Sequence, residues 1–257
     1  MIESRSGNNI LTFDDEKHQY RLNGDFVDSV TTINKLSMPE SPRLSAWKIG
    51  EGAFYVINQL KEFPQQVNKL PDYLLEEISK KSKAAWMTIA KKAANIGTIV
   101  HDYAEQFEFR GKIDEELHKT IMQHKDKAKI ISCIQKFRRW KKQNKDTILR
   151  HEEILGSVLY RFAGKFDRLA SRNGLIVLSD FKTSSGFFID QFIQLAAYTL
   201  LLKEWFNIDI DIIEIIRFGK EDGVFETKEI KDKKEIKLLQ EQFLRNLATY
   251  RFMKEHE

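Results

Sequence analysis

The sequence predicts a mixed α/β fold, in which a central sheet is flanked by helices and preceded by a mainly helical region. Apolar residues recur with a helical period over most of 29–145, over 190–206 and over 233–253. The period changes to two, as in strands, over 148–182 and 210–230. Helices and strands are segregated along the chain and do not alternate strictly, which favours a mixed sheet with helices against it.

The composition is that of a well-packed protein, with 257 residues of which 42% are hydrophobic and 31% charged. No internal repeat and no linker-like stretch interrupts the chain. We therefore expect a single domain over 1–257. Its expected parts are an N-terminal hairpin over 1–28, a mainly helical region over 29–145, a core sheet with one helix over 146–232 and a closing helix over 233–257.

The single cysteine, Cys133, excludes disulfides and any cluster of cysteine ligands. An iron–sulfur cluster or a cysteine-type zinc site is therefore not expected. No run of about 18 apolar residues is present, and the first residues lack the apolar core of a signal peptide. We expect a protein of the reducing cytosol that does not enter a membrane.

The N-terminal segment has the pattern of a small hairpin, because Asn23-Gly24 supplies the positive φ angles of a tight turn between apolar alternations. Ser29 or Thr31 is placed to cap a following helix, since a side-chain oxygen there can accept from a free backbone N–H. The expected strands cover 10–13, 18–22 and 25–27.

The region from there to residue 109 is mainly helical, with interruptions at the prolines near 39–42 and 64–71. The longest predicted helix covers 84–109. Within it, His101 shares a face with the small residues Ala94, Gly97 and Ala104, which would let the helix lie close to a sheet.

A basic amphipathic helix is predicted from Lys119 to Lys145, where ten basic residues stand against one acid, Asp126. Its apolar residues recur every three to four positions, at Ile121, Ile130, Ile134, Phe137 and Trp140. The basic outer face is either a solvated surface or a surface for a polyanion, because basic residues release counterions from nucleic-acid phosphates. The candidate DNA contacts on this helix are Arg138, Arg139, Lys141 and Lys142.

The second half of the chain predicts the core sheet. Period-two alternation and turn residues delimit each element. The expected strands cover 148–155, 160–171, 175–182, 210–218 and 224–230, and the expected helices cover 190–206 and 233–253.

The turn Asn173-Gly174 fixes the register of the central hairpin. A two-residue loop places Arg172 opposite Leu175, and the same pairing brings Asp167 opposite Asp180. Their Cβ atoms are then expected about 4.5–5.5 Å apart. Lys182 shares the face of Asp180, and Lys165 is expected opposite Lys182.

Two carboxylates at that distance repel each other, so the pairing of Asp167 with Asp180 indicates a function. A bound divalent cation removes the repulsion. Magnesium prefers oxygen ligands and retains water positions for a phosphate. A cation there can activate water and neutralise charge on a phosphodiester, while Lys182 holds the water or the phosphate. The alternative is an ordinary charged strand face, because acid-x-Lys triplets occur elsewhere in the chain.

Five segments in order resemble the motifs of the PD-(D/E)XK nuclease superfamily, in particular its RecB-like exonuclease branch. The opening segment is similar to that of phage and mitochondrial genome maintenance exonucleases of this type. The match runs from about residue 29 to residue 202. The segments are Ser29-Val30-Thr31-Thr32-Ile33, Gly97-x-x-x-His101, Gly164-x-x-Asp167, Asp180-Phe181-Lys182-Thr183 and Gln194-x-x-x-Tyr198.

This resemblance implies a restriction-endonuclease-like core and a site for one or two Mg²⁺ or Mn²⁺ ions, without an iron–sulfur cluster. It implies metal ligation by His101, Asp167, Asp180 and the main-chain carbonyl of Phe181. Lys182 would then be the catalytic lysine.

Glu152, preferred to Glu153, matches the additional glutamate of the family and is expected to orient the lysine or a water. Gln194 and Tyr198 are expected to support the site and contact the DNA backbone, with Gln191 as a competitor for that role.

The function implied is that of a metal-dependent DNA exonuclease that acts on single strands or ends, in replication, recombination or repair. A flap endonuclease with the same site and a non-catalytic recombination-accessory module are the alternatives. No Gly-x-x-x-x-Gly-Lys-Ser/Thr segment is present, so any helicase is expected to be a separate chain. Four aromatic residues either line a helical arch for DNA or belong to an ordinary core: Trp47, Phe54, Tyr55 and Trp86.

Overall fold

The computed structural model describes residues 1–63, 69–220 and 225–256. It contains two compact units, one formed by 1–38 with 99–257 and the other by 39–98. The first unit contains both sheets and every residue of the candidate site. Mixed sheets flanked by helices are present, so the predicted fold class is confirmed.

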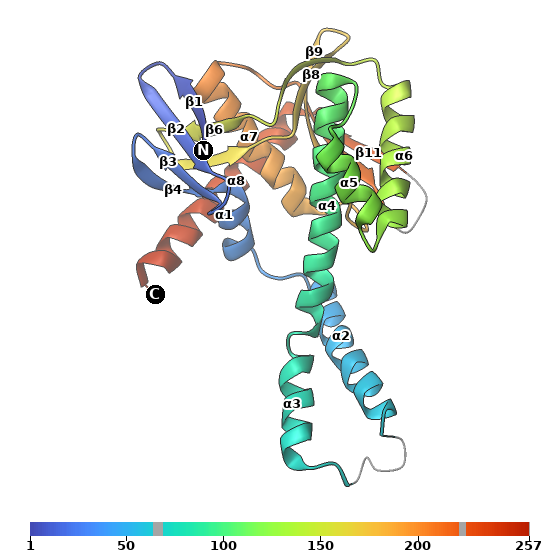
Figure 1. The fold of residues 1–257 in the computed structure, drawn as a ribbon. Helices are drawn as coiled ribbons and strands as arrows, with labels where there is room; N and C mark the ends of the chain where they lie inside the picture. The colour runs from blue at the N-terminus through green and yellow to red at the C-terminus, as the bar shows by residue number, and fades with distance from the viewer. Residues whose placement is uncertain (64–68, 221–224, 257) are drawn as a thin grey trace. The chain divides into compact units, whose positions relative to one another are not determined.

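The first sheet has six strands in the order β1-β2-β3-β4-β7-β6 (Figure 1). Its strands are β1 (Ile2–Ser6), β2 (Asn9–Asp14), β3 (Gln19–Leu22), β4 (Asp25–Ser29), β6 (Ile154–Ser157) and β7 (Phe162–Lys165). The predicted N-terminal strands are thus confirmed, with positive φ at Asn23 and Gly24. Strand β1 was missed because it is mostly polar and exposed. It is held by backbone pairing with β2.

The second sheet has five strands in the order β11-β10-β9-β8-β5. Strands β9 and β10 are parallel and the other neighbours are antiparallel. Its strands are β5 (Thr147–His151), β8 (Arg168–Arg172), β9 (Leu175–Lys182), β10 (Ile212–Phe218) and β11 (Phe225–Ile230). The β8–β9 register pairs Arg172 with Leu175, and both turn residues, Asn173 and Gly174, have positive φ. The predicted register of this hairpin is confirmed.

Two predicted strands are each divided, which corrects the sequence-based expectation. The segment predicted as 148–155 breaks at 152–153, and the segment predicted as 160–171 breaks at 166–167, so each contributes to both sheets. Two backbone hydrogen bonds join the breaks: Glu152 N–H to Asp167 O (3.0 Å) and Phe166 N–H to Glu153 O (3.3 Å). We call residues 152–153 and 166–167 the paired break.

The paired break also explains why Lys165 does not lie opposite Lys182, as the uninterrupted register predicted. Lys165 ends β7, where its partner is Ile154 in the first sheet. Its ammonium forms an ion pair with Glu152. The sequence pattern carries no sign of this change of sheet, because the apolar alternation continues through it.

Helices cover both faces of the second sheet. Leu195, Ala196 and Leu202 of α7 (Ile189–Phe206) pack in the main core with Leu178 and Ile213 of β9 and β10. Outside α7 lie α1 (Val30–Ser37) and α8 (Lys233–His256) (Figure 1). The side chain of Ser29 caps α1 by accepting from Thr32 N–H, as predicted.

The opposite face is packed by aromatic side chains of α6 (Lys127–Gln143). The rings of Phe137 and Trp140 contact those of Phe181 and Phe218 at centroid distances of 5.7–6.2 Å. Helix α4 (Ala85–Arg110) joins this layer through Tyr103, whose ring lies 6.0 Å from that of Phe137.

The single basic helix predicted over 119–145 is wrong, because two helices occupy it, α5 (Glu115–Gln123) and α6. Asp114 caps α5 by accepting from Leu117 N–H. His124 then adopts an extended conformation, and its Nδ1 accepts from Asp126 N–H, which ends one helix and begins the next. The predicted apolar face is confirmed, since all five of its residues are buried: Ile121, Ile130, Ile134, Phe137 and Trp140.

The second unit contains α2 (Pro42–Lys61), α3 (Asp72–Ser82) and the first part of α4. No residue of α2 is buried. Phe54 is 59% exposed and Trp47 36%, while Tyr55 and Trp86 are half-buried, with the Lys48 ammonium 4.2 Å from the Trp86 ring centroid. The interpretation as ordinary core is therefore wrong for Phe54 and Trp47.

None of the helices in the described ranges combines the length and the apolar character needed to cross a bilayer.

The turn of the central hairpin gives a first prediction. Gly174 has φ +83, a conformation in which a Cβ is strained, so Gly174→Ala should lower the free energy of unfolding by about 1–2 kcal/mol. Urea denaturation measures this change. Gly186→Ala is the matched control: its φ is not positive and its Cβ would meet only Phe188 Cζ at 3.8 Å. A Gly174→Ala protein as stable as the control would contradict the turn assignment.

Candidate active site

Three potential ligands meet at the paired break, which supplies Glu152 and Asp167, while α4 supplies His101. Atoms of His101 on α4, Glu152 and Asp167 all lie within 4.8 Å of one another. His101 Nδ1 is 3.3 Å from Asp167 Oδ2. All three side chains are partly accessible, so a ligand from solution can reach them.

Glu152 occupies this cluster in an unusual backbone conformation. Its φ is +51, the left-handed region that a non-glycine residue seldom adopts. The strain persists because the ladders of β5 and β6 fix the chain on either side. Burial, together with the charge of Asp167, raises the pKa of Glu152 to about 8 against the opposing effect of Lys165. A cation bound beside this carboxylate would stabilise its charged form.

Asp167 is tied to the central hairpin by its side chain. The β8–β9 ladder pairs Arg168 with Ser179, and Asp167 is the residue directly before β8. Its Oδ2 accepts a hydrogen bond of 2.8 Å from the backbone N–H of Phe181. Asp167 is therefore anchored beside Asp180, as the register predicted, although it lies just outside the ladder.

Asp180 is the buried member of the site, with 2% of its surface exposed. Burial raises its pKa to about 6, while Lys182 opposes the shift and the charge of Asp167 adds to it. The Lys182 ammonium lies 2.5 Å from Asp180 Oδ2, so the two residues share a strand face as predicted.

Lys182 is held between a carboxylate and an amide. Its Nζ donates to Gln194 Oε1 at 3.4 Å, and Gln194 Nε2 donates to Tyr198 Oη at 2.8 Å. Burial favours the neutral amine, but the charges of Asp180 and Asp167 outweigh it and raise the pKa of Lys182. The lysine is therefore a fixed, charged group next to the three-residue cluster.

Close packing around position 164 explains why this residue is a glycine. A Cβ there would lie 2.5 Å from Tyr198 Cε1 and 3.2 Å from Val30 Cγ2. Only glycine lets the ring of Tyr198 lie against β7, and that ring carries the hydroxyl that holds Gln194. Both residues of the Gly164-x-x-Asp167 motif thus support the site: Gly164 makes room for the ring of Tyr198, and Asp167 is a potential metal ligand.

Gln191 lies at the beginning of α7 and not beside Lys182. Its Oε1 accepts from Phe188 N–H at 3.1 Å, and its Nε2 donates to Ser184 Oγ at 3.2 Å. Its amide therefore organises the connection from β9 to α7.

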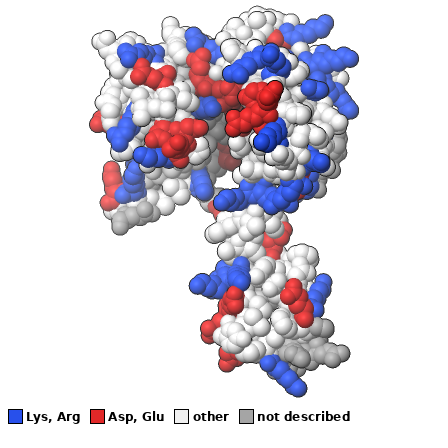
Figure 2. All heavy atoms as spheres, in the orientation of Figure 1, with Lys and Arg blue, Asp and Glu red and all other residues white. Residues whose placement is uncertain are grey.

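The four basic residues expected to contact DNA fall into two pairs. Arg138 Nε donates to Tyr103 Oη at 2.6 Å and Lys141 Nζ to Glu108 Oε1 at 2.7 Å, so both are engaged within the fold. Arg139 and Lys142 are exposed, and Arg138 is also exposed despite its hydrogen bond, whereas Lys141 is half-buried. Figure 2 shows basic side chains over the region that α5 and α6 occupy in Figure 1, interspersed with acidic ones.

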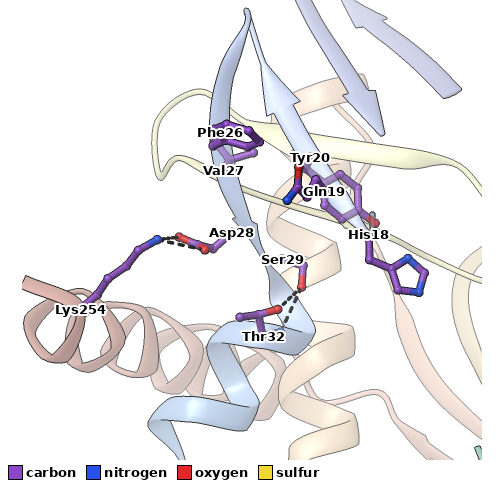
Figure 3. A pocket seen from close by; sticks show the side chains of 9 residues that line it. All are labelled: His18, Gln19, Tyr20, Phe26, Val27, Asp28, Ser29, Thr32 and Lys254. Atoms are coloured by element: carbon purple, nitrogen blue, oxygen red, sulfur yellow. Dashed lines mark hydrogen bonds and ion pairs between the residues drawn. The ribbon is translucent and has the colours of Figure 1, made fainter. Parts of the chain in front are cut away.

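A surface cavity of about 400 Å³ lies at the N-terminus of α1 (Figure 3). Its lining includes Tyr20, Ser29, Thr32 and Lys254, and Lys254 is paired there with Asp28. None of the clustered site residues lines it. The cavity is therefore separate from the candidate metal centre.

The donor set of the cluster fits a divalent cation. Two carboxylates supply the oxygen ligands that magnesium prefers, and the imidazole adds a nitrogen that manganese also accepts. Sequence reasoning gave Glu152 a supporting role, whereas the structure groups it with His101 and Asp167. The sequence did not predict the left-handed backbone conformation of Glu152, which only the paired break produces.

Comparisons with known proteins identify the family of this chain. A family model described as the PD-(D/E)XK nuclease superfamily matches residues 71–254. Among solved structures, the chain is similar to a "Putative exonuclease" from Eubacterium rectale, with 14% identity over 61% of this chain and 68% of that chain and a TM-score of 0.39. It is also similar to an alkaline exonuclease from Laribacter hongkongensis, with 12% identity over 48% and 69% of the two chains and a TM-score of 0.29. A search of curated proteins gives no match.

The elevated pKa of Glu152 predicts a pH dependence of stability in metal-free protein. Its folded-state pKa of about 8 exceeds its ordinary 4.5, so the folded state retains a proton that the unfolded state loses between those values. The contribution of Glu152 to the free energy of unfolding is fully present below pH 4.5 and is lost as the pH rises through 8. Glu152→Gln should remove this decline, as measured by urea denaturation in a chelator between pH 5 and 8.5.

Glu153→Gln is the matched control, because Glu153 pairs with Arg150 at 3.0 Å outside the cluster. It should retain the wild-type slope. Parallel curves for wild type and Glu152→Gln would contradict the account of Glu152.

Proposed function

This chain belongs to the PD-(D/E)XK nuclease superfamily, and we propose that it is a metal-dependent deoxyribonuclease that degrades DNA from ends or as single strands. The observation that carries the proposal is the cluster of His101, Glu152 and Asp167 beside the Asp180–Lys182 pair. Phosphodiester hydrolysis needs a cation and a fixed positive charge near the reacting phosphate, and the site provides positions for both.

Each side chain has a proposed task. His101, Glu152 and Asp167 hold Mg²⁺ or Mn²⁺, with Asp180 and the main-chain carbonyl of Phe181 as further ligands. The bound cation supplies an activated water and neutralises phosphate charge. No iron–sulfur cluster takes part.

Lys182 orients the water or the phosphate through its ammonium group. Asp180 and Gln194 fix the direction of that group, and Tyr198 fixes Gln194. Because these contacts exist before DNA binds, little reorganisation is needed when charge develops on the phosphate.

We propose an exonuclease because the ordered motifs from 29 to 202 resemble the RecB-like exonuclease branch. Replication, recombination or repair are the processes that supply such ends. The second candidate, a flap endonuclease with the same residues, differs in accepting DNA without ends. In either case residues 1–257 are proposed to act as one nuclease domain.

End-labelled linear and circular single-stranded DNA, each with and without Mg²⁺, test the proposal. Wild type should degrade only the linear DNA and only with the metal. Lys182→Ala should lower the rate at least about 100-fold, the size expected for a lost charge-stabilising donor, while binding in Ca²⁺ persists. Lys203→Ala, which removes an exposed ammonium on α7, is the matched control and should keep wild-type activity.

Cutting of the circle would favour the endonuclease. Wild type that leaves both substrates intact with either metal would identify a non-catalytic binding module and contradict the proposal.

Arg139 and Lys142 of α6 are proposed as part of the DNA-binding surface, together with Arg138 and Lys141 of the same helix. Arg139→Glu with Lys142→Glu should weaken DNA binding and flatten the dependence of affinity on salt by roughly one phosphate contact per residue. Fluorescence anisotropy at several salt concentrations measures both effects. Lys234→Glu with Lys237→Glu, an equal change of charge on exposed positions of α8, should leave the slope unchanged. An unchanged slope in the α6 variant would leave that helix as a solvated face.

A further inference from the structure

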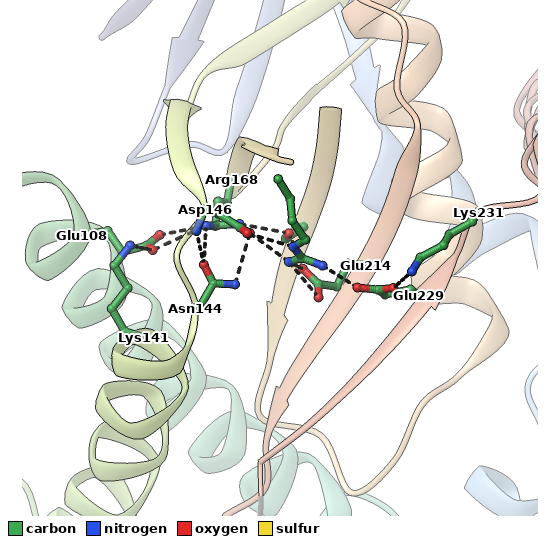
Figure 4. Close-up of polar contacts among 10 residues, drawn as sticks. Glu108, Lys141, Asn144, Asp146, Arg168, Glu214, Glu229 and Lys231 are labelled. Carbon is green, nitrogen blue, oxygen red and sulfur yellow. Dashed lines mark hydrogen bonds and ion pairs between the residues drawn. The ribbon is translucent and has the colours of Figure 1, made fainter. Parts of the chain in front are cut away.

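A buried network of ion pairs lies on the face of the second sheet opposite Asp180 (Figure 4). Ser179 and Asp180 are successive residues of β9 and therefore point to opposite faces. Asp180 contacts Lys182 in the site, whereas Ser179 Oγ donates to Glu214 Oε2 at 2.8 Å in the network. The network members are Glu108, Lys141, Asn144, Asp146, Arg168, Arg172, Ser179, Glu214 and Glu229.

Arg168 is the most enclosed charged member. Its side chain has no exposed surface, and its guanidinium pairs with the carboxylates of Glu108 and Asp146, whose side chains are each 3% exposed. Arg168 Nε is 3.2 Å from Glu108 Oε2 and Arg168 Nη1 is 3.1 Å from Asp146 Oδ2. Removing these charges from water costs free energy that offsets much of their electrostatic attraction. Stability alone is therefore a weak explanation for the presence of the ion pairs.

The positions of Arg168 and Glu108 in the chain give a stronger reason. Glu108 lies seven residues after His101 on α4, two helical turns away and near the same face. Arg168 directly follows Asp167. Their contact therefore connects the helix that carries His101 to the strand that begins directly after Asp167.

We propose that Arg168 and Glu108 are positioning residues, which set the separation of His101 and Asp167 required to hold a divalent cation. The inference rests on the proposed function, because it concerns the same metal centre. Among the described residues, the side chains of Arg168 and Glu108 form no hydrogen bond or ion pair with the side chains of His101, Glu152 or Asp167, so both act through the elements that they join.

The chemistry of the pair suits this task. Apolar side chains can slide past each other, whereas the planar fork of an arginine fixes both the distance and the direction of its partners. Lys141 of α6 holds the same carboxylate from another side, at 2.7 Å from Glu108 Oε1. The helix is thus held at residue 108 by charges from two elements.

Arg172 provides a control within the same network. It contacts Asp146 at 2.8 Å, Glu214 at 3.0 Å and also Glu229, but these partners lie on the second sheet or directly before it. None belongs to α4. A change at Arg172 disturbs the buried ion pairs without releasing the helix of His101.

The test measures Mn²⁺ affinity without DNA, by the electron paramagnetic resonance signal of the free ion. Glu108→Gln and Arg168→Lys keep the size of the side chain and weaken the contact. Each should raise the Kd for Mn²⁺ about tenfold, the lower range for residues that orient metal ligands. Arg172→Lys should change it by less than about twofold. Thermal denaturation in a chelator reports the stability of each variant separately.

Wild-type Mn²⁺ affinity in Glu108→Gln and Arg168→Lys, with or without a loss of stability, would overturn the positioning role. Failure of both conservative variants to fold would assign the pair to folding and overturn it as well. Wild type that binds no Mn²⁺ would instead refute the proposed metal-dependent function, a result distinct from either.

Discussion

The site depends on one constraint: two neighbouring segments of the chain pass from one sheet to the other at the same level. At the paired break, β5 gives way to β6 and β7 to β8, and the Glu152 N–H to Asp167 O bond keeps the two crossings together. A continuous hairpin would direct successive side chains alternately to its two faces. The break turns Glu152 and Asp167 toward the same point, where α4 adds His101.

This geometry has an electrostatic consequence. Burial raises the pKa values of Glu152 and Asp180, and the charge of Asp167 adds to both shifts, so that the values lie at about 8 and about 6. Lys182 and Lys165 compensate in part, one at each end of the group. A fold selected for stability alone would not combine a left-handed glutamate with this concentration of acids. A positive ion bound at the cluster would offset this cost, which relates the local strain to the proposed function.

The sequence predicted the hairpin register and the sharing of a face by Asp180 and Lys182, because the Asn173-Gly174 turn and the period of two are local rules. It did not predict the paired break, since apolar alternation runs through both crossings, and it therefore misplaced Lys165 and gave Glu152 a secondary role. The division of the basic helix at His124 depends on a side-chain contact that periodicity does not contain. Arg168 reads as an ordinary polar position in a strand; its burial arises only when α4 and the 144–146 segment close over it.

The central claim is that His101, Glu152 and Asp167 together bind a divalent cation. Anomalous diffraction from crystals soaked in Mn²⁺ tests it most directly. A peak is expected within bonding distance of atoms from all three residues. Crystals that bind no manganese there, or that bind it only at other acidic side chains, would contradict the account.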